Sequence, residues 1–238
     1  GSVSDSAYTH TGTIGDLRSK SFTYQDNRPF FPADTNQAYT FFGCKVPSWD
    51  LMCSAGGLLE FRATIDAQDY DTTTSLASAS YPTGVVEPFS FVGASISIDG
   101  SAYAYADSVK VSCDNALRTD DYRLRGSGLK LEQLENNLRA ISWELSADFD
   151  SLTQANRFYS ATAAGAYCTI VATFEAPTLI GVSSKPQIIV TIDNARFDDA
   201  ENGVSGPNPL KQRLSGKGLF DGTDSALTVA VVNADATA

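Results

Sequence analysis

The sequence is poor in the side chains that most hydrolases and metal sites require. It has a single histidine, His10, and four cysteines in 238 residues, and the cysteines show no CxxC spacing. A zinc site needs several His or Cys ligands at short spacings, and a catalytic triad needs a histidine to activate its nucleophile. A zinc protease and a Ser-His-Asp hydrolase are therefore excluded, and His10, in a polar segment, is expected to be solvated.

Other common signals are missing as well. No Asn-x-Ser/Thr sequon occurs, which removes one mark of a eukaryotic secreted protein. No apolar run approaches the ~18 residues of a membrane span, so no membrane insertion is expected. With no His-rich segment beside them, the cysteines are interpreted as free core residues: Cys44, Cys53, Cys113 and Cys168.

Basic residues are in the minority. Lys and Arg together number 17 against 28 Asp and Glu, giving a net charge of -11. A surface of this sign repels a phosphate backbone, so tight nucleic-acid binding is not expected.

One basic segment raises the question of a phosphate loop. The stretch from Val204 to Gly222 reads VSGPNPLKQRLSGKGLFDG. A Walker A loop needs G-x-x-x-x-G-K-[ST], but Lys211 stands in place of the first glycine and Gly218 in place of the final hydroxyl. We therefore interpret the segment as a loop that leads into an edge strand beginning near Ala226.

Three acids near one another invite a calcium hypothesis. Counting from Asp69, the glycine position of an EF-hand loop is Thr74 and the bidentate Glu position is Ser80, so the pattern fails. Asp66, Asp69 and Asp71 are interpreted as acids at a strand end and turn. Paired carboxylates of a glycosidase cannot be judged by spacing, since they meet only in three dimensions. No catalytic, cofactor-binding or metal-ligating residue is assigned.

Alternation of apolar and polar residues dominates the chain. Segments such as EFRATIDAQ and ISWELSADF place apolar side chains on one side only, as half-buried strands do. Turn residues such as Asp99-Gly100 separate these segments, which predicts a mostly antiparallel β fold. The expected strands span residues 38–46, 60–68, 89–98, 103–113, 141–149, 166–174, 187–197 and 226–232.

Outside the strands, one helix and one projecting arm are expected. Ser151 and Gln154 have capping-box spacing, which predicts a helix to about Ala161 with an apolar face of Leu152, Ala155, Phe158 and Tyr159. Residues 115–137 are too charged for a core. They are either a mobile surface loop or an arm that becomes ordered against a neighbouring subunit. Residues 1–36 are expected to be irregular.

The chain is expected to form one domain over residues 1–238. A weak repeat aligns Leu58 with Leu138 and Ile65 with Leu145, so that two strand-loop-strand units correspond. The domain is then either built from two similar halves or contains two hairpins of similar composition.

Four blocks of sequence, in order, resemble one known family. They are YTFFGCKVPSWDLMCSAGGLLEFRATIDAQDYDT from Tyr39, EPFSFVGASISIDG from Glu87, LKLEQLENNLRAISWELSADFDSLTQANRF from Leu129 and VTIDNARFDDAENGVSGPNPLKQRLSGKGLFDGTDSALTV from Val190. The family is the major tail tube proteins of long-tailed, siphovirus-like bacteriophages. Its members usually have a further N-terminal segment, so the chain is expected to be truncated at its start.

The resemblance implies a structural virion protein and no enzyme. It implies a β-sandwich or partial barrel with one flanking helix, whose extended hairpins join those of neighbours in an inter-subunit β-barrel. Hexameric rings stack into the tail tube, assembled in the host cytoplasm together with terminator, tape measure and distal tail proteins. Genomic DNA passes through the lumen without specific binding, and no cofactor is required.

Two alternatives of other classes stay open. One is a β-sandwich receptor- or carbohydrate-binding module of a tail tip, and the other is a hydrolase that uses a carboxylate pair. For the tube, the candidates for barrel formation are the arm at residues 115–137 and the first hairpin at residues 44–67. Deletion of residues 119–128 is expected to leave a folded subunit that does not polymerise.

Overall fold

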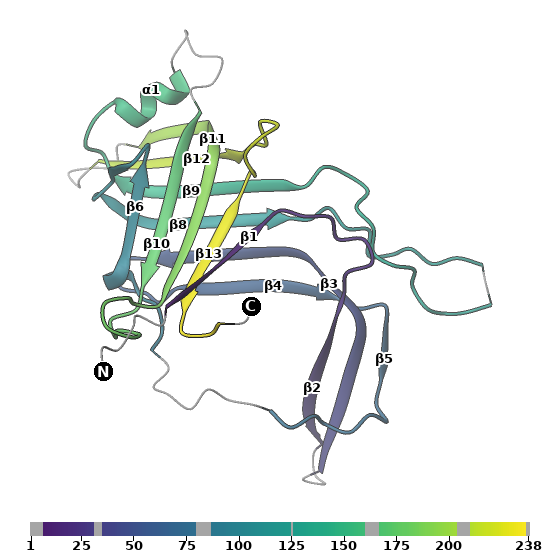
Figure 1. The fold of residues 1–238 in the computed structure, drawn as a ribbon. Helices are drawn as coiled ribbons and strands as arrows, with labels where there is room; N and C mark the ends of the chain where they lie inside the picture. Colours follow the sequence, from purple (N-terminus) through teal and green to yellow (C-terminus); the bar gives the residue numbers. More distant parts are fainter. Residues whose placement is uncertain are drawn as a thin grey trace.

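The protein is mostly β with antiparallel strands. The computed structural model describes residues 7–30, 35–79, 87–124, 126–159, 167–203 and 210–236. Within these ranges it has 13 strands, one α-helix and one short 3-10 helix (Figure 1). Every strand pair among them is antiparallel, and the predicted class is confirmed at that level.

The strands follow one another along the chain with two helical interruptions, a short one before β6 and one after β9. The strands are β1 (Tyr8–Thr13), β2 (Phe22–Phe30), β3 (Thr35–Ser54), β4 (Glu60–Asp66), β5 (Asp69–Asp71), β6 (Ala94–Ile98), β7 (Ser101–Ala102), β8 (Ala106–Asp114), β9 (Ala140–Asp148), β10 (Cys168–Glu175), β11 (Gln187–Gly203), β12 (Lys211–Gly218) and β13 (Thr228–Asn233). The helices are η1 (Phe91–Gly93) and α1 (Thr153–Tyr159).

The strands form one branched sheet that does not close on itself within the described residues. Its main path is β2-β3-β8-β9-β12-β11-β10-β6-β7. β13 pairs with β11 and β1, while β4 and β5 both pair with β3. In Figure 1, β4, β8, β9 and β12 run across the direction of β6, β10, β11 and β13, and the β2-β3-β5 unit projects from the body.

The two crossing groups of strands share one hydrophobic core. Trp143 and Leu145 of β9 lie in it with Phe174 of β10 and Ile192 of β11, and each of these side chains is at most 3% exposed. The ring of Trp143 meets the ring of Phe197 edge to face, with centroids 4.8 Å apart. The alternating residues of β8 and β9 thus bury one face, while the opposite face of the same strands is left to solvent.

The Gly-Lys-Gly segment is a central strand, so its interpretation as a loop was wrong. β12 lies between β9 and β11, and its residues alternate between exposed and buried. A Cβ at Gly216 would lie 1.7 Å from the Arg196 carbonyl oxygen and 2.9 Å from Trp143 Cζ2. The glycines are present because backbone and indole approach too closely for a side chain, and a turn is not formed there.

Bulges explain why β3 is longer than expected. The predicted strand ended at Val46, just before Pro47, a residue that cannot donate a backbone hydrogen bond to a sheet. β3 instead continues through Pro47, with a register shift between Lys45 and Ser48 against β4. A second shift lies near Gly43, whose φ of +60° suits glycine.

The other expected strands differ mainly at their starts. β4, β9 and β11 confirm the predicted segments, with β11 extending to Gly203. β6 begins at Ala94 because residues 91–93 form η1, and β8 begins at Ala106 after a turn. β10 begins at Cys168 within the described residues.

The expectation that residues 1–36 are irregular was wrong for the described part, which contains β1 and β2, and β13 is not an edge strand. β1 pairs with β13, so Tyr8 lies opposite Asn233 from the far end of the chain. β2 pairs with the first half of β3. β1 is polar and its partner comes from the far end of the chain, so no local pattern marks it, whereas β2 forms a hairpin with β3 that the sequence analysis did not assign.

The helix is present but its predicted apolar face is mostly exposed. The Ser151 hydroxyl accepts a hydrogen bond from the Thr153 amide at 3.3 Å, so Ser151 acts as the cap. Gln154 does not complete the capping box, because its amide oxygen accepts from Arg157 Nε. Ala155 is buried, whereas Tyr159 is 63% exposed and donates from its hydroxyl to the Ala200 carbonyl of β11. The expected helix end near Ala161 lies outside the described residues.

Candidate assembly surfaces

One broad sheet face carries only small polar and charged side chains, apart from Met52 and Ala140. We call it the serine-rich face; it comprises the solvent-facing residues of β4, the second half of β3, β8, β9 and β12. Cross-strand pairing places them on one side: Glu60, Arg62, Thr64, Ser48, Asp50, Met52, Ser54, Ser108, Lys110, Ser112, Asp114, Ala140, Ser142, Glu144, Ser146, Asp148, Lys211, Arg213, Ser215 and Lys217.

The charges on the serine-rich face are balanced and mostly paired. Arg213 contacts Glu144 at 2.8 Å, and Lys211 contacts Asp148 at 2.7 Å and also Asp107. Lys110 lies 3.4 Å from Asp50. Pairs this exposed stabilise little, but they occupy the bases with protein carboxylates. The face therefore offers a phosphate few unpaired cations, the exception being Lys217, which has no ion pair with a described residue.

The strand at one border of this face has an open edge. β4 pairs only with β3 among the described strands. Phe61 and Ile65 occupy the positions that alternation assigned to the core, yet they are 64% and 43% exposed. Phe61 packs on Trp49, with ring centroids 6.0 Å apart. β4 thus combines unpaired backbone groups with exposed apolar side chains, an arrangement that invites a further strand.

The arm, residues 115–137, leaves the body after β8 and returns to β9 (Figure 1). Its two legs lie antiparallel: the Arg118 amide donates to the Leu134 carbonyl at 2.9 Å and the Leu131 amide to the Asp121 carbonyl at 2.9 Å. It is therefore a narrow hairpin without a regular ladder. The base of the arm is ordered within the single chain, so the idea that it orders only against a neighbour was wrong for this part.

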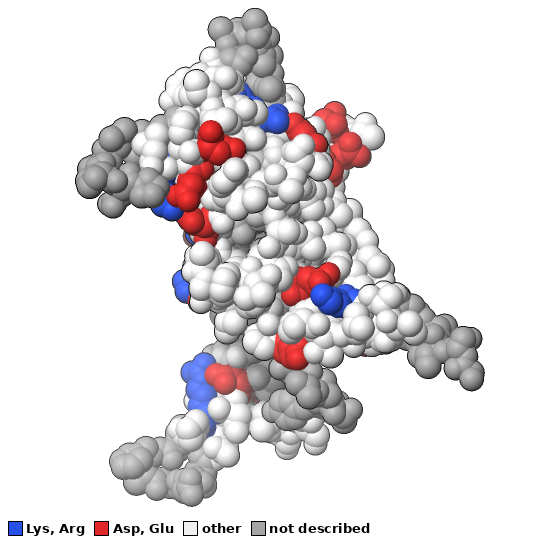
Figure 2. Space-filling model, turned by 90° about the vertical axis from the view of Figure 1, so that its left-hand side faces the viewer, with Lys and Arg blue, Asp and Glu red and all other residues white. Residues whose placement is uncertain are grey.

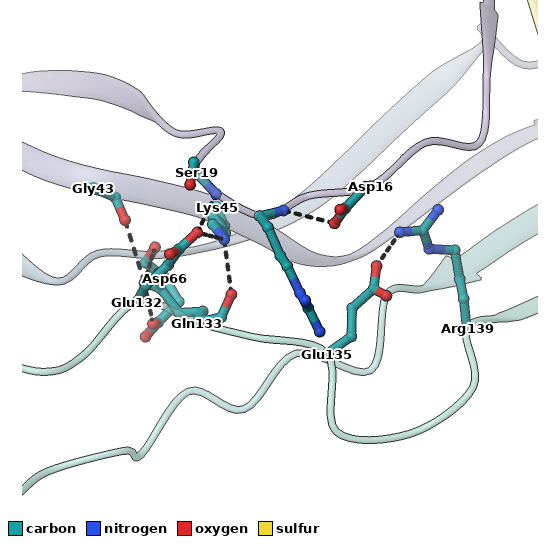
Figure 3. Close-up of polar contacts among 10 residues, drawn as sticks. Asp16, Ser19, Gly43, Lys45, Asp66, Glu132, Gln133, Glu135 and Arg139 are labelled. Carbon is teal, nitrogen blue, oxygen red and sulfur yellow. Dashed lines mark hydrogen bonds and ion pairs between the residues drawn. The ribbon is translucent and has the colours of Figure 1, made fainter.

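A buried polar cluster holds the base of the arm (Figure 3). The Lys45 ammonium of β3 has a side chain only 4% exposed, and it donates to Glu132 Oε1 at 2.8 Å and to the Gln133 carbonyl at 2.8 Å. Gln133 is 1% exposed and donates to Asp66 Oδ2 at 2.8 Å. A buried ammonium is tolerated only with such partners. The bond from Lys45 is also the main cause that lowers the pKa of Glu132.

Further bonds fix both feet of the arm. The Asn115 amide side chain donates to the Val46 carbonyl at 2.8 Å, next to the bulge at Pro47. The Arg139 guanidinium, behind the second foot, pairs with Glu135 and donates to the Gly15 carbonyl at 3.1 Å. Sequence reasoning recognised the arm from its charge but missed Lys45 and Gln133, because nothing local marks a lysine in a strand as buried.

Two apolar side chains at the tip of the arm are exposed. We define the tip as residues 122–128, of which Arg125 lies outside the described residues. Leu124 is fully exposed, at 109% of its reference area, and Tyr122 is 58% exposed. Apolar side chains held this far from a core have no stabilising role in the monomer.

A second projection is formed by β2, the first half of β3, and β5. Aromatic rings lie side by side along it: Tyr39 stacks with Phe41 at 6.5 Å and with Tyr70 at 6.4 Å. The Arg28 guanidinium lies over the Tyr39 ring, 4.7 Å from its centroid. These contacts stiffen an extension that has no core of its own.

The residues considered for chemistry have ordinary structural roles. Asp71 accepts hydrogen bonds from Thr73 and Thr74, which lower its pKa, and so ends β5 in a polar turn. His10 is not simply solvated, since Nε2 lies 2.8 Å from the Asp235 carbonyl oxygen, to which it donates.

The cysteines are free and buried, as predicted. Burial raises the pKa of the Cys168 thiol to about 12 and that of Cys113 to about 11, so neither is a reactive thiolate at neutral pH.

No described helix is both long and apolar enough to cross a lipid bilayer.

Comparison with known protein families gave a match over most of the chain. A family model described as phage tail tube protein matches residues 4–218. No curated protein matches the chain. The match spans all four sequence blocks up to Gly218 and confirms the resemblance drawn from them.

Proposed function

Because the chain belongs to the phage tail tube protein family, and is thus a structural component of the virion and not an enzyme, we propose that it forms the tube as stacked hexameric rings. In this proposal residues 1–238 act as one β-sandwich domain. The tail is that of a long-tailed, siphovirus-like phage, and the tube conducts the genome into the host. Terminator, tape measure and distal tail proteins are its expected partners during assembly in the host cytoplasm.

The observation that carries the proposal is the open edge of β4 beside the serine-rich face. A strand edge left unpaired in a soluble monomer is a liability, and pairing with another copy removes it. Strands added across this edge would continue the serine-rich face from one subunit to the next. Repetition around a rotation axis would then close a barrel of strands from several copies.

The position of the core favours the serine-rich face as the wall of the bore. The other face of β8, β9 and β12, and of the second half of β3, is covered by β6, β10, β11 and β13 through the shared core. In a ring, the strands β6, β10, β11 and β13 can be accommodated on the outside but not within a narrow channel. The face toward the bore would be the one with serine hydroxyls and paired charges.

Such a wall suits the passage of DNA. Binding of a polyanion depends on unpaired Lys and Arg that release counterions from phosphates. On the serine-rich face Lys110, Lys211 and Arg213 are paired with carboxylates, so they are poor phosphate ligands. DNA would bind this wall only weakly because the basic side chains on it are neutralised by neighbouring carboxylates. The excess of acids that gives the chain its negative charge lies outside the serine-rich face.

Electron microscopy of the purified protein tests the proposal. Negative-stain images should show rings or tubes with a central bore, and a three-dimensional reconstruction should place β4 at a subunit boundary. Deletion of residues 119–128, which removes the tip and the end of the first leg of the arm, should leave a folded protein that makes no tubes. A wild-type protein that sediments as a monomer at all concentrations, with saturable binding to a glycan array, would contradict the tube and support a tail-tip binding module.

A further inference from the structure

β4 has an apolar face that its own chain leaves uncovered. Phe61, Ala63 and Ile65 point away from the serine-rich face, and all three are exposed. On the same side of β9, Trp143 and Leu145 are buried in the core shared with β6, β10, β11 and β13. The layer that covers this side of the sheet therefore stops short of β4.

The opposite border of the same sheet is the second half of β11. The sheet runs β4-β3-β8-β9-β12-β11. β10 pairs with β11 only as far as Ala195, and from Phe197 to Gly203 β12 is the sole partner of β11 among the described strands. Two unpaired edges thus lie at opposite ends of one sheet, separated by five strand spacings or about 24 Å.

The helix α1 lies at the second of these edges, on the side of the sheet away from the serine-rich face. Its Ala155 belongs to the shared core, and the Tyr159 hydroxyl donates to the carbonyl of Ala200 in β11 at 3.3 Å. In Figure 1, α1 and β4 lie at opposite ends of the row formed by β12, β9, β8 and β4. The sheet is therefore covered at its β11 border and uncovered at its β4 border.

The exposed side of α1 is apolar and carries no free charge. Leu152 and Tyr159, two turns apart, are 58% and 63% exposed, and the ring of Phe158 lies edge to face with that of Tyr159. Arg157 is the one charged residue in the helix sequence TQANRFY, and its guanidinium pairs with Asp99 at 2.6 Å. Figure 2 shows the side on which β6 lies in Figure 1, and charged side chains form only small clusters on it. An aromatic surface without free charge is typical of the centre of a protein interface.

Rotational symmetry brings the two borders of the sheet together. In a closed ring each copy makes a head-to-tail contact, so one border of the sheet meets the opposite border of the next copy. Rotation about the ring axis leaves the direction of each strand along that axis unchanged. Because neighbouring strands alternate in direction from β4 to β11, these two strands run in opposite senses. β4 would therefore meet β11 of the next copy antiparallel, as in every described strand pair.

We propose that, within a ring, β4 of one copy pairs with the second half of β11 of the next copy, whose α1 covers the apolar face of β4. The inference rests on the proposed function, since it names the partner of the β4 edge. Leu152 and Tyr159 of the next copy bury Phe61 and Ile65, so the covering layer that β4 lacks in its own chain comes from its neighbour. Both surfaces are uncharged, and neither loses an ion pair when they meet.

Cysteine pairing tests the contact between α1 and β4. All four native cysteines are buried, so they do not compete. Leu152→Cys and Ile65→Cys place one exposed thiol on each surface. The double variant, assembled and then mildly oxidised, should give a ladder of covalent species that ends at the number of copies counted in one ring by microscopy. An equimolar mixture of the two single variants should stop at dimers.

A neighbouring position on β4 is the matched control. Thr64→Cys faces the serine-rich side, and with Leu152→Cys it should give no ladder. A ladder from Ile65→Cys with Tyr122→Cys, but none with Leu152→Cys, would show that the arm covers β4 and would overturn the proposal.

Two further outcomes separate the contact from the tube itself. Tubes without a ladder, for Leu152→Cys with either Ile65→Cys or Phe61→Cys, would overturn the contact and leave the proposed function intact. Wild-type protein that forms neither rings nor tubes would defeat the proposed function. If the cysteine variants do not assemble, a reconstruction of wild-type tubes decides the matter: α1 placed away from the neighbouring β4 would overturn the contact.

A charge exchange gives an independent readout. Ile65→Glu or Leu152→Lys alone should raise the concentration needed for tube formation at least about tenfold, because an unpaired charge enters an apolar contact. Monomer stability in urea should change little, since both side chains are exposed in the single chain. The Ile65→Glu, Leu152→Lys double variant should assemble at a lower concentration than either single variant, whereas Thr64→Glu with Leu152→Lys should not. A double variant no better than the single variants would show that the two surfaces do not meet.

Discussion

The β3–β4 and β8–β9 hairpins have the same alternating pattern, yet one ends at an open edge and the other lies in the middle of the sheet. Ile65 of β4 is 43% exposed, while Leu145 of β9, its counterpart in the aligned sequence, is 2% exposed. β9 has β8 and β12 on its two sides, whereas β4 has β3 alone among the described strands. Alternation therefore predicts that a segment is a strand, but the number of its neighbours decides what its apolar side chains do.

The difference also separates two kinds of stability. Apolar residues of β9 hold the monomer together, because they lie in the shared core. Apolar residues of β4 have nothing comparable to pack against in a single chain, and in the proposed tube they would contribute to contacts between copies. Whether the two hairpins arose by duplication stays a prediction, since similar topology does not distinguish common origin from common composition.

The largest effect is expected where β12 crowds β9. Gly216 pairs with Trp143, and an added Cβ would collide with the Arg196 carbonyl oxygen at 1.7 Å. Gly216→Ala should therefore destabilise the protein by more than about 4 kcal/mol and leave little soluble folded material. Circular dichroism and urea unfolding measure this.

Lys217→Ala, one residue further along β12 and facing solvent, is the matched control and should fold normally. A well-folded Gly216→Ala protein with the stability of the control would mean that β11 and β12 are not this close.

Truncating one apolar side chain in each hairpin to alanine tests whether β4 and β9 differ in packing. Leu145→Ala should lower the free energy of unfolding by about 3 kcal/mol, since it opens a cavity in the core. Ile65→Ala should lower it by less than about 1 kcal/mol in the monomer, because the side chain is already half in water. Urea unfolding of the unassembled variants gives both values.

In an assembly assay, Ile65→Ala should have the larger effect of the two variants, the opposite of their effects on monomer stability. Ile65→Ala is expected to raise the concentration at which tubes form, whereas any Leu145→Ala protein that folds should assemble near the wild-type threshold. Equal losses of monomer stability in the two variants would show that β4 is as well packed as β9.

A smaller effect is expected at the base of the arm. Glu132→Ala leaves the buried Lys45 ammonium without its carboxylate and should cost about 2 kcal/mol. The figure is below that of a fully buried pair because Glu132 is itself 37% exposed. Lys45→Met removes the charge together with its need for a partner and should cost less.

An exposed pair on β4 is the control for this cluster. Glu60→Ala breaks a contact with Arg62 in which both side chains are more than half exposed, and should change stability by less than about 0.5 kcal/mol. If Glu132→Ala behaves like Glu60→Ala in urea unfolding, the Lys45 cluster does not hold the arm.

The smallest effect is a pH dependence at the same cluster. Folding lowers the pKa of Glu132, chiefly through the hydrogen bond from Lys45. Such a carboxyl stabilises the fold above its unfolded pKa of about 4.3 and loses that contribution as pH falls through the lower folded value. The stability difference between wild type and Glu132→Gln should therefore be full at pH 6 and shrink as pH falls below about 4.

Glu175→Gln serves for comparison, since the pKa of Glu175 is lowered by Lys185 in a separate place. Combining it with Glu132→Gln should leave the pH dependence due to Glu132 unchanged. A difference between wild type and Glu132→Gln that is the same at pH 6 and pH 3.5 would contradict the pairing.

Part of the fold could be predicted because the information is local. β4, β9 and the first half of β11 follow from period-two alternation, and Ser151 marked the start of the helix. β12 could not be found in this way. Two of its inward positions are glycine, a residue that sequence rules assign to turns. The need for glycine comes from the Arg196 carbonyl at Gly216 and from the Ala226 carbonyl at Gly218. That requirement exists only after the strands have been placed side by side.

Candidate surfaces were predictable in outline only. Charge in residues 115–137 indicated a projection, and the structure bears this out. Burial of Lys45 and Gln133 was not predictable, because their partners come from segments 87 and 67 residues away. β1 was missed for the same reason, since it pairs with β13 across the length of the chain.

β3 is a single run of 20 residues that serves both the core and the projecting β2-β3-β5 unit. Force applied to the projection is therefore carried along one continuous backbone into the centre of the molecule. Separating the two parts requires sliding β3 past β8 and β4, which loads many hydrogen bonds at once instead of opening them one by one. A chain built this way resists being pulled apart along the strand direction, and the pairing with β2 is interrupted only by the register shift near Gly43.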